Sequence, residues 1–152
     1  MISGATEVIT NVGPVAVQDV SHSAIVSVLS LWDGKLCFRQ MHDWSKRGIG
    51  STAVIVFQSG AVLKTGLMTA VLQRFGEKTE WKPAGYLEEG SHVLRCATDG
   101  STAWWEPVVS VTPGLAEDMY DFQVNQSHCF FANNTLIHGQ ISEEQKPGER
   151  RV

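Results

Sequence analysis

The sequence predicts an all-β fold made of many short strands. Most apolar residues fall into runs of about four to eight that are rich in Val, Ile, Thr and Trp, a composition typical of strands. Gly, Pro, Asn or an Asp-Gly pair ends almost every run, as turn residues do. Only residues 84–90 suggest as much as one helical turn.

The apolar runs give the expected strand positions in order. Strands are predicted at 7–10, 15–20, 25–31, 36–41, 53–57, 61–64, 70–75, 80–83, 92–96, 103–111, 119–124, 129–132 and 136–138. Turns are predicted at 11–14, 33–34, 59–60, 99–100 and 113–114. Residues 33–47 are more polar than their neighbours and predict a hairpin and loop. In the run at 103–111, Trp104 and Trp105 should point in opposite directions, one into the core and one to the surface.

Composition favours one compact domain over residues 1–140. The 152 residues are 43% hydrophobic and include five Trp and six Phe, enough for a sizeable core. Residues 141–152 are mostly polar and predict a tail or connector. The net charge of −4 argues against nucleic acid or an acidic membrane as a partner. Without a membrane-spanning run or signal peptide, we expect a cytoplasmic or virion-associated protein, not one secreted by a signal peptide.

The three cysteines predict buried, reduced thiols. Cys37, Cys96 and Cys129 cannot all pair within one chain and have no C-x-x-C spacing. A disulfide framework or structural zinc site is therefore not expected. We also expect no metal, no cofactor and no small-molecule substrate.

Four segments carry a resemblance to a known family. Residues 120–138 alternate as strands do and set Asp121, His128 and His138 at characteristic spacings. Residues 1–20, 60–72 and 81–90 match further blocks in the same order, the last reading Trp-Lys-Pro-Ala-Gly-Tyr-Leu-Glu-Glu-Gly. Over nearly its whole length the chain resembles the Hedgehog/intein (Hint) family, specifically a mini-intein without an endonuclease. The resemblance implies a flat horseshoe of many short antiparallel strands in which both chain ends meet at a central site.

The resemblance also implies which reactive groups should be present, and several are replaced. Where the family has a nucleophilic Cys, this chain has Met1, whose thioether cannot form an acyl intermediate. Ala5 replaces an Asp, and Met68 replaces a His that acts as a general acid. Gly139 replaces the Asn that cyclises. As Met1 begins the given chain, we expect no upstream bond to cleave; Gln140 could cyclise only in a shifted frame that moves His138 out of register.

Thr65, Asp121, His128 and His138 are the family positions that remain. They are either the surviving wall of an active site or vestigial residues that satisfy backbone amides and form a buried polar cluster. Cys129 beside His128 suggests a cysteine hydrolase, but adjacent strand residues point to opposite faces, so only His138 could approach the thiol.

Two function classes follow. In the first, the chain is a catalytically degenerate Hint module with a structural or protein-interaction role, in complex with a protein partner or as a homo-oligomer. The frequency of Hint domains in phages makes a role in a phage particle an expectation by analogy. In the second, it is a mini-intein for autocatalytic protein splicing that substitutions at the first Cys and final Asn positions have inactivated. The losses at Ala5 and Met68 favour the first.

Overall fold

The computed structural model describes residues 1–22 and 27–139, which are almost entirely strand and turn. The strands are β1 (Ile2–Ser3), β2 (Glu7–Thr10), β3 (Gly13–Ala16), β4 (Ser27–Trp32), β5 (Lys35–Gly50), β6 (Thr52–Phe57), β7 (Val62–Gly66), β8 (Ala70–Phe75), β9 (Lys78–Pro83), β10 (His92–Cys96), β11 (Ala103–Pro113), β12 (Glu117–Val124), β13 (Cys129–Ala132) and β14 (Thr135–His138). Two 3₁₀ helices, η1 (Val17–His22) and η2 (Ala84–Tyr86), complete the described part. The all-β prediction is confirmed; the predicted tail at 141–152 and residue 140 lie outside the described residues.

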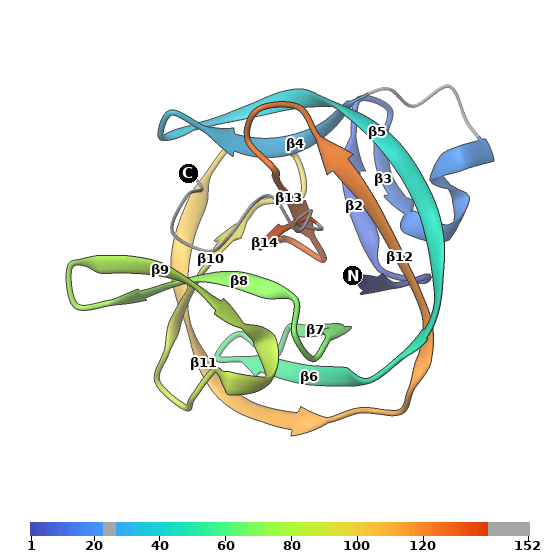
Figure 1. The fold of residues 1–152 in the computed structure, drawn as a ribbon. Helices are drawn as coiled ribbons and strands as arrows, with labels where there is room; N and C mark the ends of the chain where they lie inside the picture. The colour runs from blue at the N-terminus through green and yellow to red at the C-terminus, as the bar shows by residue number, and fades with distance from the viewer. Residues whose placement is uncertain (23–26, 140–152) are drawn as a thin grey trace.

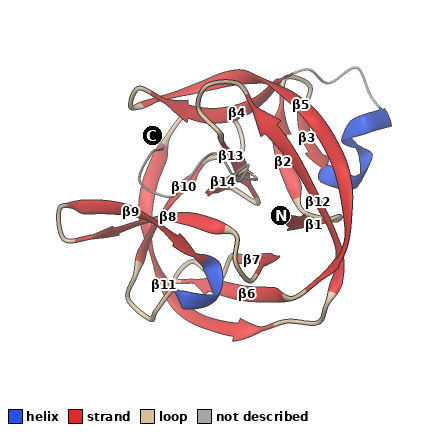
Figure 2. Ribbon diagram, viewed as in Figure 1, coloured by secondary structure: helices blue, strands red, loops and turns tan. Residues whose placement is uncertain are grey.

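The strands form one strongly curved sheet in the order β10-β11-β6-β7-β1-β12-β5-β4-β2-β13-β14-β8-β9. All pairings among the described strands are antiparallel, and β10 also pairs with β14 and β8, which brings the two ends of this order together. The long strands β5, β11 and β12, together with β6, curve around the outside, and β1, β7, β13 and β14 lie near the centre (Figures 1 and 2). The fold therefore places the first strand and the last described strand inside the same curved sheet.

The inner strands supply much of the core. β13 and β14 are buried at every position because both of their faces are covered. Phe122 and Phe130 pack with ring centroids 4.2 Å apart at the centre of the larger cluster. As predicted, one indole turns inward: Trp105 packs against the second cluster, whereas Trp104 is 42% exposed. Within residues 1–22 and 27–139, no helix has the length and apolar content to cross a membrane.

Two hairpins have short connections whose residues adopt the positive φ angles that their types favour. Asp33 and Gly34 both have positive φ, 52° and 73°, and join β4 to β5 in the hairpin twist that this pair favours. Asn133 and Asn134, at 44° and 64°, make the same kind of connection between β13 and β14. These connections fix the register of the strands on either side.

The prediction of a strand at 15–20 is wrong after Ala16, because residues 17–22 form η1. Val17 and Val20 are buried and the two residues between them are less so. This three-residue spacing suits one face of a 3₁₀ helix and not the alternation of a strand. Of the strand predicted at 25–31, residues 25 and 26 lie outside the described part, and β4 covers the rest.

The prediction at 33–47 is confirmed for the hairpin, which turns at Asp33-Gly34, but wrong for the loop. Apart from the turn at Asp33-Gly34, these residues belong to β5, which continues to Gly50. β12 pairs along much of this strand, for example Tyr120 with Lys46, and the register shifts at two places where β5 has one residue more than β12. Polar residues remain in strand conformation here because their backbone bonds are made to a distant partner strand, not because of their own propensity.

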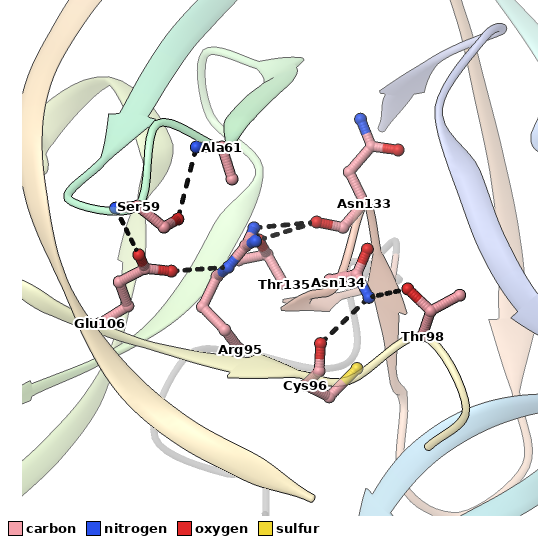
Figure 3. Close-up of polar contacts among 9 residues, drawn as sticks. All are labelled: Ser59, Ala61, Arg95, Cys96, Thr98, Glu106, Asn133, Asn134 and Thr135. Carbon is pink, nitrogen blue, oxygen red and sulfur yellow. Dashed lines mark hydrogen bonds and ion pairs between the residues drawn. The ribbon is translucent and has the colours of Figure 1, made fainter. Parts of the chain in front are cut away.

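Arg95 organises a buried polar network between β10, β11 and the β13–β14 turn (Figure 3). Its Nε donates to Glu106 Oε1 at 3.1 Å, and its Nη1 donates to Asn133 O and Thr135 Oγ1, each at 3.0 Å. Glu106 Oε2 accepts from the Ser59 amide at 2.8 Å. Both charged side chains are 8% exposed, so the pair lies away from water but with most of its bonding groups satisfied.

Candidate functional site

Residue 1 is held at the centre of the fold by its neighbours on both sides. Ile2 pairs with Thr65 of β7 and with Tyr120 of β12, so β1 lies between these two strands. The Met1 carbonyl oxygen accepts three hydrogen bonds, from the Gly66 amide (3.0 Å), Thr65 Oγ1 (3.1 Å) and Thr69 Oγ1 (2.6 Å). The Met1 nitrogen donates to Thr69 Oγ1 at 2.9 Å.

A cavity of about 490 Å³ opens beside residue 1. Its lining includes Met1, the turn at residues 66–69, Asp121, His138 and Gly139. The first and last described segments of the chain therefore meet at one concave site. Much of its lining is apolar, because the side chains of Met1, Leu67 and Met68 stand at its edge, 41%, 38% and 63% exposed.

Asp121 is buried on β12, with 2% of its surface exposed. Its Oδ1 accepts a hydrogen bond from the Phe122 amide at 2.9 Å. This bond is local and satisfies a backbone group of the same strand, as the structural interpretation of this residue expects. Within residues 1–22 and 27–139, no three His, Cys, Asp or Glu side chains are grouped so that they could hold a metal ion.

The imidazole rings of His128 and His138 are stacked. Their rings are 6.2 Å apart and nearly parallel, at 17°. His138 lines the cavity, is 3% exposed and meets the Trp81 ring edge-on at 5.0 Å. Its Nδ1 lies 2.7 Å from the Gly139 carbonyl oxygen, which can only accept, so this nitrogen carries the hydrogen. His128 occupies the turn before β13 with φ 57°, and its Nδ1 is buried without a hydrogen bond to any described residue.

Of the four positions at which the chain differs from the family motifs, three line the cavity and one does not. Met1, Met68 and Gly139 line the cavity. Ala5 lies in the exposed turn between β1 and β2, outside the lining. A Cβ at Gly139 would lie 3.0 Å from the Phe122 carbonyl oxygen, so an asparagine there needs a shift of a few tenths of an ångström in its surroundings.

Thr69 is the site residue that the sequence analysis missed. It follows Met68 directly and bonds both the nitrogen and the carbonyl oxygen of residue 1. A search for Thr-x-x-His stops at Met68, so the motif gives no reason to consider the next residue. The available signal was a second threonine four residues after Thr65, at the far side of a short turn containing Gly66.

Cys129 does not have the surroundings of a nucleophile. It is opposite His138 in the β13–β14 register, but its Sγ contacts Ser30 Oγ at 3.5 Å and the Leu31 carbonyl oxygen at 3.4 Å. Burial raises the pKa of the Cys129 thiol, and the hydrogen bonds around it only partly oppose this. The thiolate, which is the reactive form, is therefore disfavoured.

Comparison with solved structures identifies the fold. The DnaB intein from Synechocystis sp. PCC 6803 superimposes with a TM-score of 0.80 at 20% identity, covering 92% of this chain and 98% of the intein. The PabCDC21-1 intein gives 0.80 at 18% identity, covering 91% and 98%, and the DnaX mini intein from Spirulina platensis gives 0.76 at 20%, covering 90% and 98%. No family model and no curated protein sequence matches the chain. The chain has the all-β Hint fold of the mini-inteins, with residue 1 and Gly139 at the central site that the sequence resemblance implied.

Proposed function

We propose that this chain is a catalytically degenerate Hint module that serves as a structural or protein-interaction unit and does not splice. The observation that carries the proposal is the lining of the cavity beside residue 1. Met1 offers a thioether and no acidic proton, Met68 offers no general acid, and Gly139 has no side-chain amide. Acyl transfer from residue 1 and cyclisation at residue 139 therefore each lack the group that forms the new bond.

The remaining polar side chains support a structural role. Thr65 bonds the Met1 carbonyl, Asp121 bonds the Phe122 amide and His138 bonds the Gly139 carbonyl. Each of these contacts satisfies a backbone group close to the cavity. Such bonds stabilise the strand ends whether or not a reaction takes place.

The outer face of β6 and β7 supports an interaction role. Ala53 and Ile55 point into the core, so Val54 and Val56 point outward and are only partly covered. Val62, opposite Val56 in the register, is 47% exposed. These neighbouring valines form an apolar surface on the solvent side of the sheet, which we propose as the contact for another protein.

A second function, a mini-intein inactivated by substitution, is favoured by one observation. The carbonyl of residue 1 still accepts three hydrogen bonds, and Gly139 still shares its cavity. This arrangement supports a site in which splicing was lost by substitution of the reactive groups.

Restoring the reactive groups tests the choice between these functions. The variant carries Met1→Cys behind a short upstream peptide, Gly139→Asn, Met68→His and Ala5→Asp, and mass spectrometry measures spliced or cleaved products. We expect none, and a product that is absent from the matched Met1→Ala fusion would overturn the proposal. Because Gly139→Asn needs local adjustment, circular dichroism should first establish that the variant is folded.

The interaction role has its own test, the Val62→Lys variant. Light scattering after size-exclusion chromatography measures the mass of the wild type with its partner or second copy. We expect Val62→Lys to weaken the association, whereas Thr79→Lys on exposed β9 leaves it unchanged. A wild type that is strictly monomeric and co-purifies with no protein would contradict the role.

A further inference from the structure

Thr69 makes a two-point contact with the backbone of residue 1. Its hydroxyl oxygen accepts from the Met1 nitrogen at 2.9 Å, and its hydroxyl hydrogen is donated to the Met1 carbonyl oxygen at 2.6 Å. A hydroxyl can do both at once because it has one hydrogen and two lone pairs. The residue is 6% exposed, so these bonds face little competition from water.

The backbone around Thr69 is shaped for this contact. The Thr69 amide donates to the Gly66 carbonyl at 3.0 Å and closes the turn, and the Ala84 amide donates to the Thr69 carbonyl at 2.8 Å. A Cβ at Gly66 would lie 2.7 Å from Thr69 Oγ1 and 2.9 Å from the Met1 carbonyl oxygen. Only glycine at this position lets the turn and the first strand approach so closely.

We propose that Thr69 is the positioning residue of the central site and fixes residue 1 there, at the position next to the one where the family has its histidine. This proposal rests on the proposed function in one respect: both take this cavity to be the site at which a splicing relative would react. An alcohol is a poor proton donor at neutral pH, so Thr69 orients the backbone and does not act as an acid.

The contact also determines where a chain segment preceding residue 1 would lie. β1 runs antiparallel to both neighbours, so one step beyond Ile2 places residue 1 opposite Gly66 and Asp121. The next position along this line falls beside Leu67, at the cavity. Thr69 therefore directs an upstream peptide into the cavity.

Hydrogen exchange of the Gly66 amide tests the positioning directly, because this amide donates to the same Met1 carbonyl. Thr69→Val keeps the shape but removes both hydroxyl bonds, and we expect exchange measured by NMR to become about tenfold faster. Thr69→Ser should restore protection to within about threefold of wild type. Thr79→Val, the same substitution on exposed β9, controls for the change of residue type.

Thiol-induced cleavage gives a second readout that a merely structural residue would not move. In a Met1→Cys fusion, the thiol introduced at residue 1 would attack the preceding carbonyl and form a thioester, and its proton would pass to the released residue-1 nitrogen. A dithiothreitol thiol would then attack the thioester carbonyl and release the residue-1 thiol, which separates the upstream peptide from the chain. If the Met1→Cys fusion cleaves, Thr69→Val should cleave at least about tenfold more slowly than Thr69→Ser. Equal and measurable cleavage by these two variants would overturn the proposal.

The two readouts separate this proposal from the proposed function. If no fusion cleaves but Thr69→Val accelerates Gly66 exchange and Thr69→Ser and Met68→Ala do not, Thr69 positions a non-reactive site and both proposals stand. If the parent fusion cleaves, the degenerate function fails and the Thr69 comparison still decides its role. Equal Gly66 exchange in Thr69→Val and Thr69→Ser, or acceleration as large in Met68→Ala, would refute the role of Thr69.

Discussion

The Arg95 network and the residue-1 site are both buried polar centres, but they are built from different groups. The first uses an ion pair whose members are bonded on several sides by Ser59, Asn133 and Thr135. The second uses neutral hydroxyls and backbone groups beside a cavity of about 490 Å³. The first centre is closed by bonds between its own members, whereas the second opens onto a cavity, and proteins bind ligands in concave cavities.

The largest predicted effect breaks the Arg95 network. Arg95→Leu leaves the Glu106 carboxylate buried without its partner, and we expect the free energy of unfolding to fall by about 3–5 kcal/mol. Urea denaturation measures this change. Arg74→Leu is the control, since Arg74 is exposed and lies 5.0 Å from the Trp105 ring, and it should cost less than about 1 kcal/mol. Similar losses in the two variants would show that Arg95 acts only through packing.

A smaller loss is expected at the residue-1 site. Gly66→Ala forces its Cβ against Thr69 and the Met1 carbonyl, for which overpacking costs about 1–3 kcal/mol. Gly50→Ala is the matched control, because its nearest contact is the Met119 side chain at 3.1 Å, which can move. Urea denaturation again gives the comparison, and an equal loss in both variants would argue against the close approach at Gly66.

Acid should weaken the Arg95 network selectively. Burial would raise the pKa of Glu106, but hydrogen bonds from Ser59 and the charge of Arg95 outweigh it, so this pKa lies below its ordinary value of 4.5. Since the unfolded chain then binds the proton more readily, the stabilisation is present above pH 4.5 and is lost as pH falls through the folded pKa.

The urea midpoint between about pH 7 and pH 3 measures this loss, and Glu106→Gln should flatten its acid slope. Glu117→Gln is the comparison variant. The hydrogen bond from Lys64 lowers the pKa of Glu117 too, but this side chain is 34% exposed and solvent screens the pair. If the urea midpoint of Glu106→Gln fell with pH as steeply as that of the wild type, the Arg95 network would not be the cause of the acid sensitivity.

The smallest predicted effect is chemical and leaves stability unchanged. Burial raises the pKa of Cys96 to about 12 and also raises that of Cys129. Little thiolate is present at neutral pH, so half-buried Cys37 should be alkylated first by iodoacetamide, as followed by mass spectrometry. Alkylation in urea provides the control for intrinsic reactivity. If Cys129 reacted as fast as Cys37, the cysteine-hydrolase hypothesis would regain support.

The sequence predicted the strands that carry their own apolar pattern. Alternation marks the buried face of 53–57, and a continuous apolar run marks 129–132 as a strand buried on both faces. It did not predict the full length of β5, whose polar half is held by pairing with β12, a strand far later in the chain. Among site positions, motif spacing located Thr65 and Asp121. Thr69 was missed because its role depends on the turn at Gly66 and on a contact with residue 1, which spacing alone does not encode.

The position of β1 between β7 and β12 has a consequence for how the protein is made. Ile2 needs Thr65 and also Tyr120, a partner 118 positions later (120 − 2), before its pairings are complete. Contacts this distant form slowly because a long loop must close first. During synthesis from the N-terminus, Ile2 must therefore wait for Tyr120, and the pairing that places residue 1 at the central site cannot be complete before residue 120 has been made.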